Sequence, residues 1–232
     1  MEDSVLPRFL RLALTIVIIV NITMVLIASF MYPPLLSIPG SNYYILKLLA
    51  ILLLYCVGVL LVTKSSTNLY VLRTGTLFGI LGSILEIIHI LMENYGHLNQ
   101  SAESISTGLF MVGLFLLFGL SGFVYTYEQR SIKGGIFVGT WSSVVCMLIV
   151  MTFGLSQLFW SFNVIESRNN GNPDFIRSGW TDIHAFTIAD IFEASFKILS
   201  LGPVLGIIFG LIGASLFWVL PERKRNSLRH KN

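Results

Sequence analysis

The sequence predicts an all-α, polytopic membrane helix bundle of about six transmembrane helices, with both termini in the cytoplasm. Three observations predict it. Of the 232 residues, 54% are hydrophobic and only 12% are charged, whereas charged residues make up about 25% of a typical soluble domain. Six apolar runs are long enough to cross a bilayer, and Lys and Arg are concentrated in alternate connections between them.

The six apolar runs define the predicted spans. In hydrocarbon, every backbone N–H and C=O must be satisfied within its own segment, and these runs exceed the ~10 residues of a barrel strand, so they are predicted to be helices. The connections are short, which favours a single domain over residues 1–232. The spans cover approximately residues 10–31, 44–62, 74–92, 106–125, 134–159 and 198–220.

The distribution of basic residues predicts the orientation. The N-terminal end, the second and fourth connections and the tail over residues 221–232 together hold eleven of the 15 Lys and Arg residues. The opposite connections hold only Arg168 and Arg177, both in the loop over residues 160–181. The positive-inside rule therefore places both termini in the cytoplasm, and the plasma membrane is the expected location. The basic tail is also expected to attract anionic lipid.

The stretch before the last span is predicted to be an amphipathic helix at the outer surface. A seventh span over residues 185–200 would bury Asp190, Glu193 and Lys197 in the bilayer and would move the basic tail outside. Glu193 and Lys197 are instead spaced i, i+4, in the order that favours an ion pair. Thr181 and Asp182 are the candidate N-caps of this helix.

The third span carries the strongest functional signal. At 100° per residue, three glycines and three ionisable residues fall within about 80° of one helix face. The glycines are predicted to let a neighbouring backbone approach closely along the inner half, and the ionisable residues to form a polar site in the outer half. These six residues are Gly75, Gly79, Gly82, Glu86, His89 and Glu93.

Glu86 is the costliest residue in the predicted bilayer. It lies roughly 9 Å below the end of its span at ~1.5 Å per residue, and a central charge costs about 2.5 to 3.5 kcal/mol on insertion scales. Its spacing from His89 leaves three interpretations open. The two side chains could close a helix interface by hydrogen bonding, bind a solute or proton, or contribute the i, i+3 element of a metal site.

A second group of ionisable residues, Asp182, His184, Asp190 and Glu193, is predicted on the same side of the membrane as Glu86. If the third and last spans pack together, the two groups meet, although His184 points away from the others on a continuous helix. Pro203 is expected to kink the last span near its start. Close packing of that span is predicted from its small residues, Gly202, Gly206, Gly210 and Gly213.

Three functions remain open from the sequence. No Walker loop, G-x-S-x-G, H-E-x-x-H or zinc-spaced cysteine pattern is present, and no cofactor and no nucleic-acid partner are predicted. The favoured function is a proton-coupled permease for a small solute or ion, in contact with the lipid bilayer. The alternatives are a non-catalytic subunit or assembly factor, as a homo-oligomer or in a larger complex, and an intramembrane enzyme with a metal held by carboxylates and His89 or His184.

Overall fold

The computed structural model describes residues 5–38, 40–64, 69–96 and 99–219, and these residues form helices and connections without any strand. The predicted all-helical fold is thus confirmed over the described residues, while the basic tail over 221–232 lies outside them. The helices, in chain order, are α1 (Val5–Met31), α2 (Pro34–Ser37), α3 (Ser41–Lys64), α4 (Leu69–Tyr95), α5 (Gln100–Gln129), α6 (Ile132–Trp160), α7 (Phe162–Asn169), α8 (Pro173–Ser178) and α9 (Ile183–Val219).

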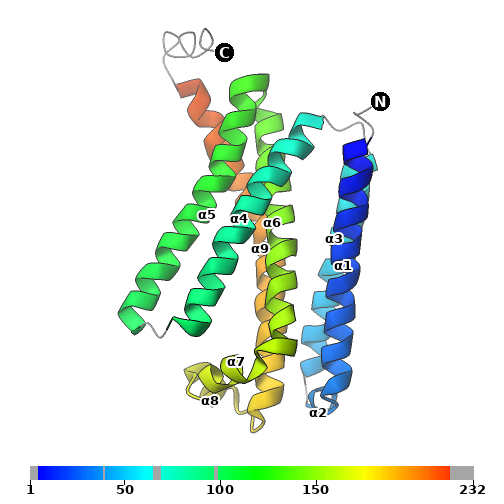
Figure 1. The fold of residues 1–232 in the computed structure, drawn as a ribbon, viewed down its shortest axis with the longest axis vertical. Coiled ribbons are helices and arrows are strands. Elements are labelled where there is room, and N and C mark those ends of the chain that lie inside the picture. Colours follow the sequence, from blue (N-terminus) through cyan, green and yellow to red (C-terminus); the bar gives the residue numbers. More distant parts are fainter. Residues whose placement is uncertain (1–4, 39, 65–68, 97–98, 220–232) are drawn as a thin grey trace.

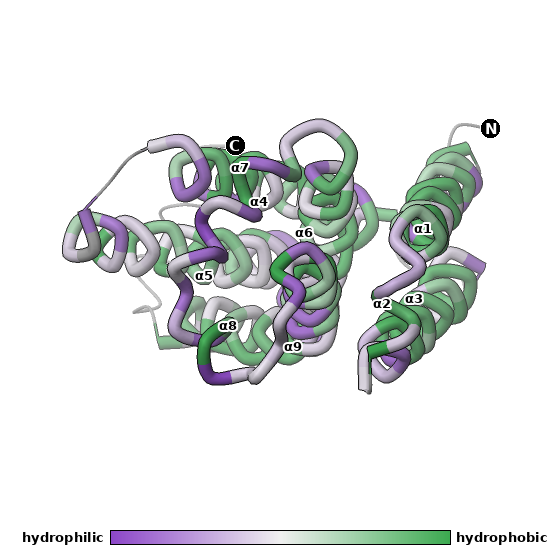
Figure 2. Tube along the Cα trace, turned by 90° about the horizontal axis from the view of Figure 1, so that it is seen from below, coloured by the Kyte–Doolittle hydropathy of each residue, from purple (hydrophilic) through white to green (hydrophobic). Residues whose placement is uncertain are grey.

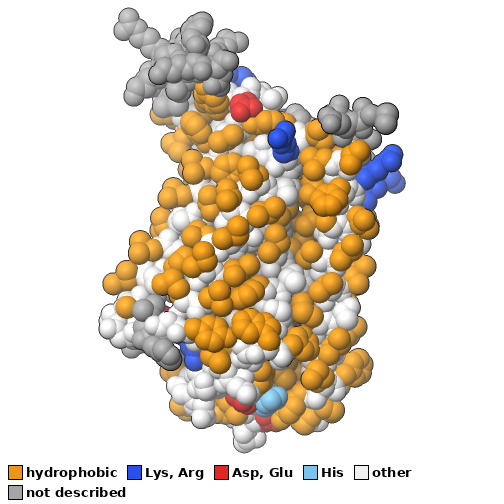
Figure 3. Space-filling view, viewed as in Figure 1, with side chains coloured by type: hydrophobic (Ala, Val, Ile, Leu, Met, Phe, Trp, Pro, Cys, Tyr) orange, Lys and Arg blue, Asp and Glu red, His pale blue; other side chains and the backbone are white. Residues whose placement is uncertain are grey.

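Six of these helices, α1, α3, α4, α5, α6 and α9, are long and apolar enough to cross a membrane. They run up and down in one bundle, so that α1 begins and α9 ends at the same end of it (Figure 1). The opposite end carries α2, α7 and α8, and we call it the loop end. Hydrophobic side chains cover the middle of the face drawn in Figure 3, as expected for a surface in contact with lipid.

Helix α6 is the centre of the bundle. Of its most apolar window 61% is buried, against 22–33% for the other five long helices. It packs against α4 and α9, and also contacts α1 and α5. Helices α1 and α3 form a pair beside the group α4, α5, α6 and α9, as the view from the loop end shows (Figure 2).

Glycines allow the closest of these contacts. A Cβ on Gly79 of α4 would lie 2.7 Å from the carbonyl oxygen of Ser142 on α6. One on Gly139 of α6 would lie 2.6 Å from the Cα of Gly210 on α9. Real Cβ atoms essentially never approach other atoms so closely, so these positions hold their helices in near backbone contact. Within a bilayer, such close van der Waals packing is a main source of helix association.

The last helix differs from the expected arrangement. Instead of an amphipathic surface helix followed by a separate span, α9 is one uninterrupted helix of 37 residues, roughly 56 Å long at 1.5 Å per residue. That length exceeds the ~30 Å of a hydrocarbon core. The predicted surface helix is therefore the first turns of the spanning helix. The predicted outer loop is also partly helical, because α7 and α8 form within it.

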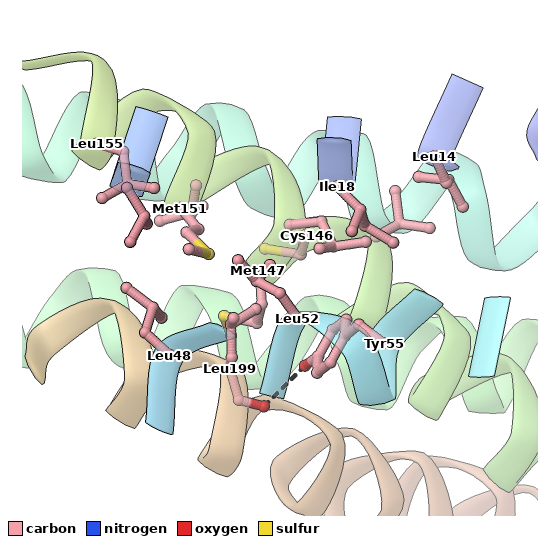
Figure 4. Close-up of a cluster of buried hydrophobic side chains, with 14 of the residues drawn as sticks. Leu14, Ile18, Leu48, Leu52, Tyr55, Cys146, Met147, Met151, Leu155 and Leu199 are labelled. Atoms are coloured by element: carbon pink, nitrogen blue, oxygen red, sulfur yellow. Dashed lines mark hydrogen bonds between the residues drawn. The ribbon is translucent and has the colours of Figure 1, made fainter. Parts of the chain in front are cut away.

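Helix α9 continues through Pro203 because a neighbouring helix compensates for it. Proline has no N–H, so the carbonyl of Leu199, four residues earlier, loses its helical partner. The hydroxyl of Tyr55 on α3 donates a hydrogen bond to that carbonyl at 2.7 Å, in a buried setting (Figure 4). The freed carbonyl is thus used to join α3 to α9, and it does not line a polar cavity.

Replacing Tyr55 by Phe is expected to lower the free energy of unfolding by about 1–3 kcal/mol, because the Leu199 carbonyl would be buried without a partner. Thermal unfolding of the purified protein in detergent measures the change. Tyr43→Phe is the control, since the Tyr43 side chain lies on the surface of the same helix and is 66% exposed. An equal loss in both variants would contradict the role assigned to this hydrogen bond.

Candidate functional site

A cavity of about 760 Å³ lies at the loop end, between α4, α5, α6 and α9, with α7 and α8 at its edge. Four carboxyl groups, one guanidinium and one imidazole line it, so its charged groups are mainly acidic. These six side chains are Glu86, His89 and Glu93 on α4, Glu103 on α5, Arg168 on α7 and Asp190 on α9. The structure thus brings the acidic residues of the third and last spans to one cavity.

Glu86 and His89 form a hydrogen-bonded pair that contains a proton. His89 Nδ1 lies 3.2 Å from Glu86 Oε1, and His89 Nε2 lies 3.2 Å from the Thr107 hydroxyl. The Thr107 hydroxyl also contacts the backbone carbonyl of Glu103 at 3.0 Å, and when it donates its only hydrogen there, Nε2 is the donor toward Thr107. The Nδ1···Oε1 contact then requires a second proton, on the carboxyl or on the imidazole. In either case the pair is net neutral.

One oxygen of this pair is buried and has no hydrogen-bond partner among the described residues. The side chains of His89 and Glu86 are only 6% and 10% exposed, and the His89 ring stacks on Phe110 with 5.0 Å between the ring centroids. The oxygen without a partner is Oε2 of Glu86. A buried acceptor without a partner is costly. A hydrogen-bond donor or a cation that came close to this oxygen would therefore be stabilised.

Gln157 of α6 supplies a second incompletely satisfied group. Its Oε1 accepts a hydrogen bond from Asn94 of α4 at 3.4 Å, while its buried Nε2 has no partner among the described residues. The residue is 3% exposed and lines the same cavity. The wall of the cavity therefore contains an unpaired donor as well as an unpaired acceptor.

Arg168 closes one side of the cavity. Its guanidinium donates to the backbone carbonyl of Glu93, to Asn94 Oδ1 at 3.0 Å and to the Glu103 carboxylate. It thereby joins α7 to the end of α4 and the start of α5. A second cavity of about 290 Å³ shares Arg168, Glu93, Asn94 and Glu103 with the first. These four side chains therefore form the wall between the two cavities.

The acidic residues on α9 have different environments. Asp190 lines the cavity and forms no ion pair with a Lys or Arg in the described part of the chain. Glu193 lies outside the lining and pairs with Lys197 at 3.1 Å, with the predicted i, i+4 spacing. Of the three predicted candidates within this helix, His184, Asp190 and Glu193, only Asp190 shares the cavity with Glu86.

Asp182 and His184 lie in a separate cluster near the end of α1. Asp182 is the N-cap of α9, as its carboxylate accepts a hydrogen bond from the backbone N–H of Ala185 at 3.0 Å. It also accepts one from the hydroxyl of Tyr32 at 2.6 Å. The His184 ring lies 4.4 Å from the Tyr32 ring, and its Nδ1 is 3.0 Å from Glu166 Oε1. This cluster ties α1 and α7 to the start of α9.

The hydrogen bond between Tyr32 and Asp182 shifts both pKa values. It is the main cause that raises the pKa of Tyr32 to about 12, with partial burial as the second cause. Burial acts to raise the pKa of Asp182, but the hydrogen bonds from Tyr32 and from the backbone of Ala185 and His184 outweigh it and lower that pKa below the usual 3.8. The hydrogen bond is therefore strongest at pH values between the pKa of Asp182 and the pKa of Tyr32.

Tyr32→Phe is expected to lower the free energy of unfolding by about 1–2 kcal/mol at neutral pH, since it removes a hydrogen bond to a carboxylate. Because the pKa of Asp182 is lower in the folded protein, its contribution is present above pH 3.8 and decreases as the pH falls through the folded value. The difference between wild type and variant should shrink in acid. Thermal unfolding of wild type and variant at neutral pH and in acid tests this prediction. A stability difference between the two proteins that stays the same in acid would contradict it.

Five residues that build this site were not identified as site candidates from the sequence: Asn94, Glu103, Thr107, Gln157 and Arg168. Gln157 carried a usable signal, because an amide inside the predicted span 134–159 is costly unless it has a partner. Arg168 entered the sequence argument only as a loop charge, and nothing in its neighbourhood predicted that it reaches α4 and α5. No three His, Cys, Asp or Glu side chains within the described ranges are grouped closely enough to hold a metal ion.

The fold and cavity together describe a protein with six long apolar helices, compatible with a multi-pass membrane location, and with a cavity whose charged lining is mainly acidic. Comparisons of the chain with protein-family models, with curated protein sequences and with solved structures give no match. The functional argument therefore depends on the chemistry of the cavity.

Proposed function

We propose that this protein is a permease that exchanges a small cation for a proton, with the cavity at the loop end as its binding site. The observation that carries this proposal is the unpartnered Oε2 of Glu86, buried in a cavity whose charged groups are four carboxyls against one guanidinium. A site with this excess of acidic groups attracts cations and disfavours anions.

The Glu86 and His89 pair provides the coupling. With its proton, the pair is neutral and its hydrogen bond is complete. Without that proton, the carboxylate and the Nδ1 lone pair face each other at 3.2 Å and the pair has a net charge of −1, which a bound cation would neutralise. Proton and cation therefore compete to neutralise the same negative charge, which is the requirement for exchange. A charge in this setting is too costly to remain unneutralised.

The surrounding structure suits a moving part. Helices α4 and α9 meet α6 at glycines, where backbones can slide past one another without interlocking large side chains. Transporters commonly place such sites between packed helices and expose them alternately to the two sides. By the predicted orientation, the loop end faces outward, so the cavity would receive its solute from outside.

Proteoliposomes that enclose a pH-sensitive dye test the proposal. Equal osmolar additions of NaCl, KCl, tetramethylammonium chloride, urea and glycerol are compared outside vesicles without an initial pH gradient. At least one cation should raise the internal pH, because cation entry is coupled to proton exit, and neither neutral solute should do so. Glu86→Gln should abolish the rise, because an amide cannot exchange this proton.

Glu193→Gln is the matched control, because Glu193 is acidic and lies close to Asp190 on α9 but does not line the cavity. It should retain the wild-type response. A wild-type protein that moves protons with none of the cations, or a Glu86→Gln variant that moves them as fast as wild type, would reject the permease and favour a role in docking a partner.

A further inference from the structure

The cavity also indicates what kind of cation it binds. We propose that its ligand is an aliphatic diamine, with one ammonium group at Glu86 and the other at Asp190. This inference rests on the proposed function for its biological meaning, but the binding it describes can be measured without transport.

The first argument is the separation of the acidic groups. Glu86 and His89 are already in contact at 3.2 Å, so an Asp190 carboxylate beside them would complete a group of three possible metal ligands. The described residues contain no such group. Asp190 therefore lies apart from the pair, elsewhere in the lining of the cavity. A single metal ion needs several ligands converging at about 2.0–2.6 Å, whereas two separated carboxylates match a ligand with two separated charges.

The second argument is the apolar part of the cavity wall. Side chains of Ile90, Met111, Val150, Ile191 and Ile198 line the cavity along with the polar ones. A hydrated inorganic ion gains nothing from such a wall, but the methylene groups of an alkyl chain are stabilised by about 0.8 kcal/mol each when buried. The alternation of acidic and apolar lining thus corresponds to a chain with charged ends.

The third argument is size. A volume of about 760 Å³ falls within the ~300–1,000 Å³ of sites for small organic molecules, and it is far larger than one bare ion needs. A short diamine fits with room for water, which has a share of about 30 Å³ per molecule in the liquid. Such a water could accept the hydrogen bond that Gln157 Nε2 has to offer.

The protein already holds one nitrogen cation at the edge of the same cavity. The Arg168 guanidinium is bound there by the Glu103 carboxylate, by Asn94 Oδ1 and by the backbone carbonyl of Glu93. The carboxyls of Glu86 and Asp190 form no ion pair with a Lys or Arg among the described residues. They are therefore the ones left for ammonium groups of a ligand.

Isothermal titration calorimetry of the full chain in detergent tests this inference. The probes are 1,4-diaminobutane, n-butylamine, MgCl₂ and NaCl at matched ionic strength. The diamine should bind at least tenfold more tightly than butylamine, and MgCl₂ should bind at least tenfold more weakly than the diamine. Diamines with three, five and six methylene groups then measure the span between the two carboxylates.

Two variants assign the ends of the ligand. Asp190→Asn should reduce the affinity for the diamine to that for butylamine and leave butylamine unchanged, whereas Glu86→Gln should weaken both by at least tenfold. Glu193→Gln, the control on the same helix, should change neither by more than twofold. The inference is overturned if Mg²⁺ binds as tightly as every diamine in wild type, or if Asp190→Asn leaves the preference for the diamine intact.

The outcome separates the two proposals. Diamine binding with no proton exchange for any cation, 1,4-diaminobutane added to the same vesicles included, would retain the amine site and reject the permease. Proton exchange driven by Na⁺, K⁺ or tetramethylammonium, without diamine binding, would retain the permease and reject the amine. The wild-type titrations alone decide the selectivity, so the test does not depend on either variant folding.

Discussion

Gly139→Ala is expected to cost about 3 kcal/mol or more of folding free energy, the upper end of the range for overpacking. The new methyl carbon would lie 2.6 Å from the Cα of Gly210 and 2.7 Å from the carbonyl oxygen of Gly206. Both are backbone atoms of α9, so no side chain can rotate away. The clash can be relieved only by separating α6 from α9, the central packing of the bundle.

Thermal unfolding and size-exclusion profiles of the purified protein measure this effect. Gly154→Ala is the matched control, because Gly154 belongs to the same helix and a Cβ there would meet nothing within 4 Å. That variant should be as stable as wild type or up to about 1 kcal/mol more stable, since alanine favours a helix over glycine by this amount. Similar behaviour of the two variants would show that α6 and α9 are not in the close contact described.

Glu86→Met is expected to remove proton exchange, reducing its rate to less than a tenth of wild type, while the melting temperature stays equal or rises. A methionine of similar size removes a carboxyl whose Oε2 is buried without a partner among the described residues, and such an unpaired polar group costs about 1–3 kcal/mol. The loss of one hydrogen bond to His89 costs about 1 kcal/mol. Because the first effect is larger, the variant should keep the melting temperature of wild type while it loses proton exchange.

This variant distinguishes a site from a structural contact. If the bond between Glu86 and His89 existed to close the interface, removing the carboxyl would lower the melting temperature. Glu193→Met is the comparison, because the Glu193 side chain is 33% exposed and its ion pair with Lys197 is worth less than about 1 kcal/mol. A melting temperature that falls well below that of Glu193→Met would restore the structural interpretation of Glu86.

The sequence by itself determined the local structure and the costly residues. Runs of apolar residues longer than a bilayer is thick leave the backbone only the helix, so six long helices followed from composition and spacing. Glu86 and His89 were identified because a helix has a fixed angle per residue and an acid has a known cost in hydrocarbon. The i, i+4 pair of Glu193 and Lys197 is local in the same way.

Only the tertiary structure decided which polar residues share a cavity. Gln157 and Arg168 both contact Asn94, although each lies more than sixty positions away from it in the chain. No periodicity within one segment predicts contacts of that kind. Similarly, the sequence indicated a kink at Pro203, but it did not indicate that the hydroxyl of Tyr55 satisfies the carbonyl that proline leaves free. Helical periodicity fixes the face on which a side chain lies, whereas its partner depends on how the helices pack against one another.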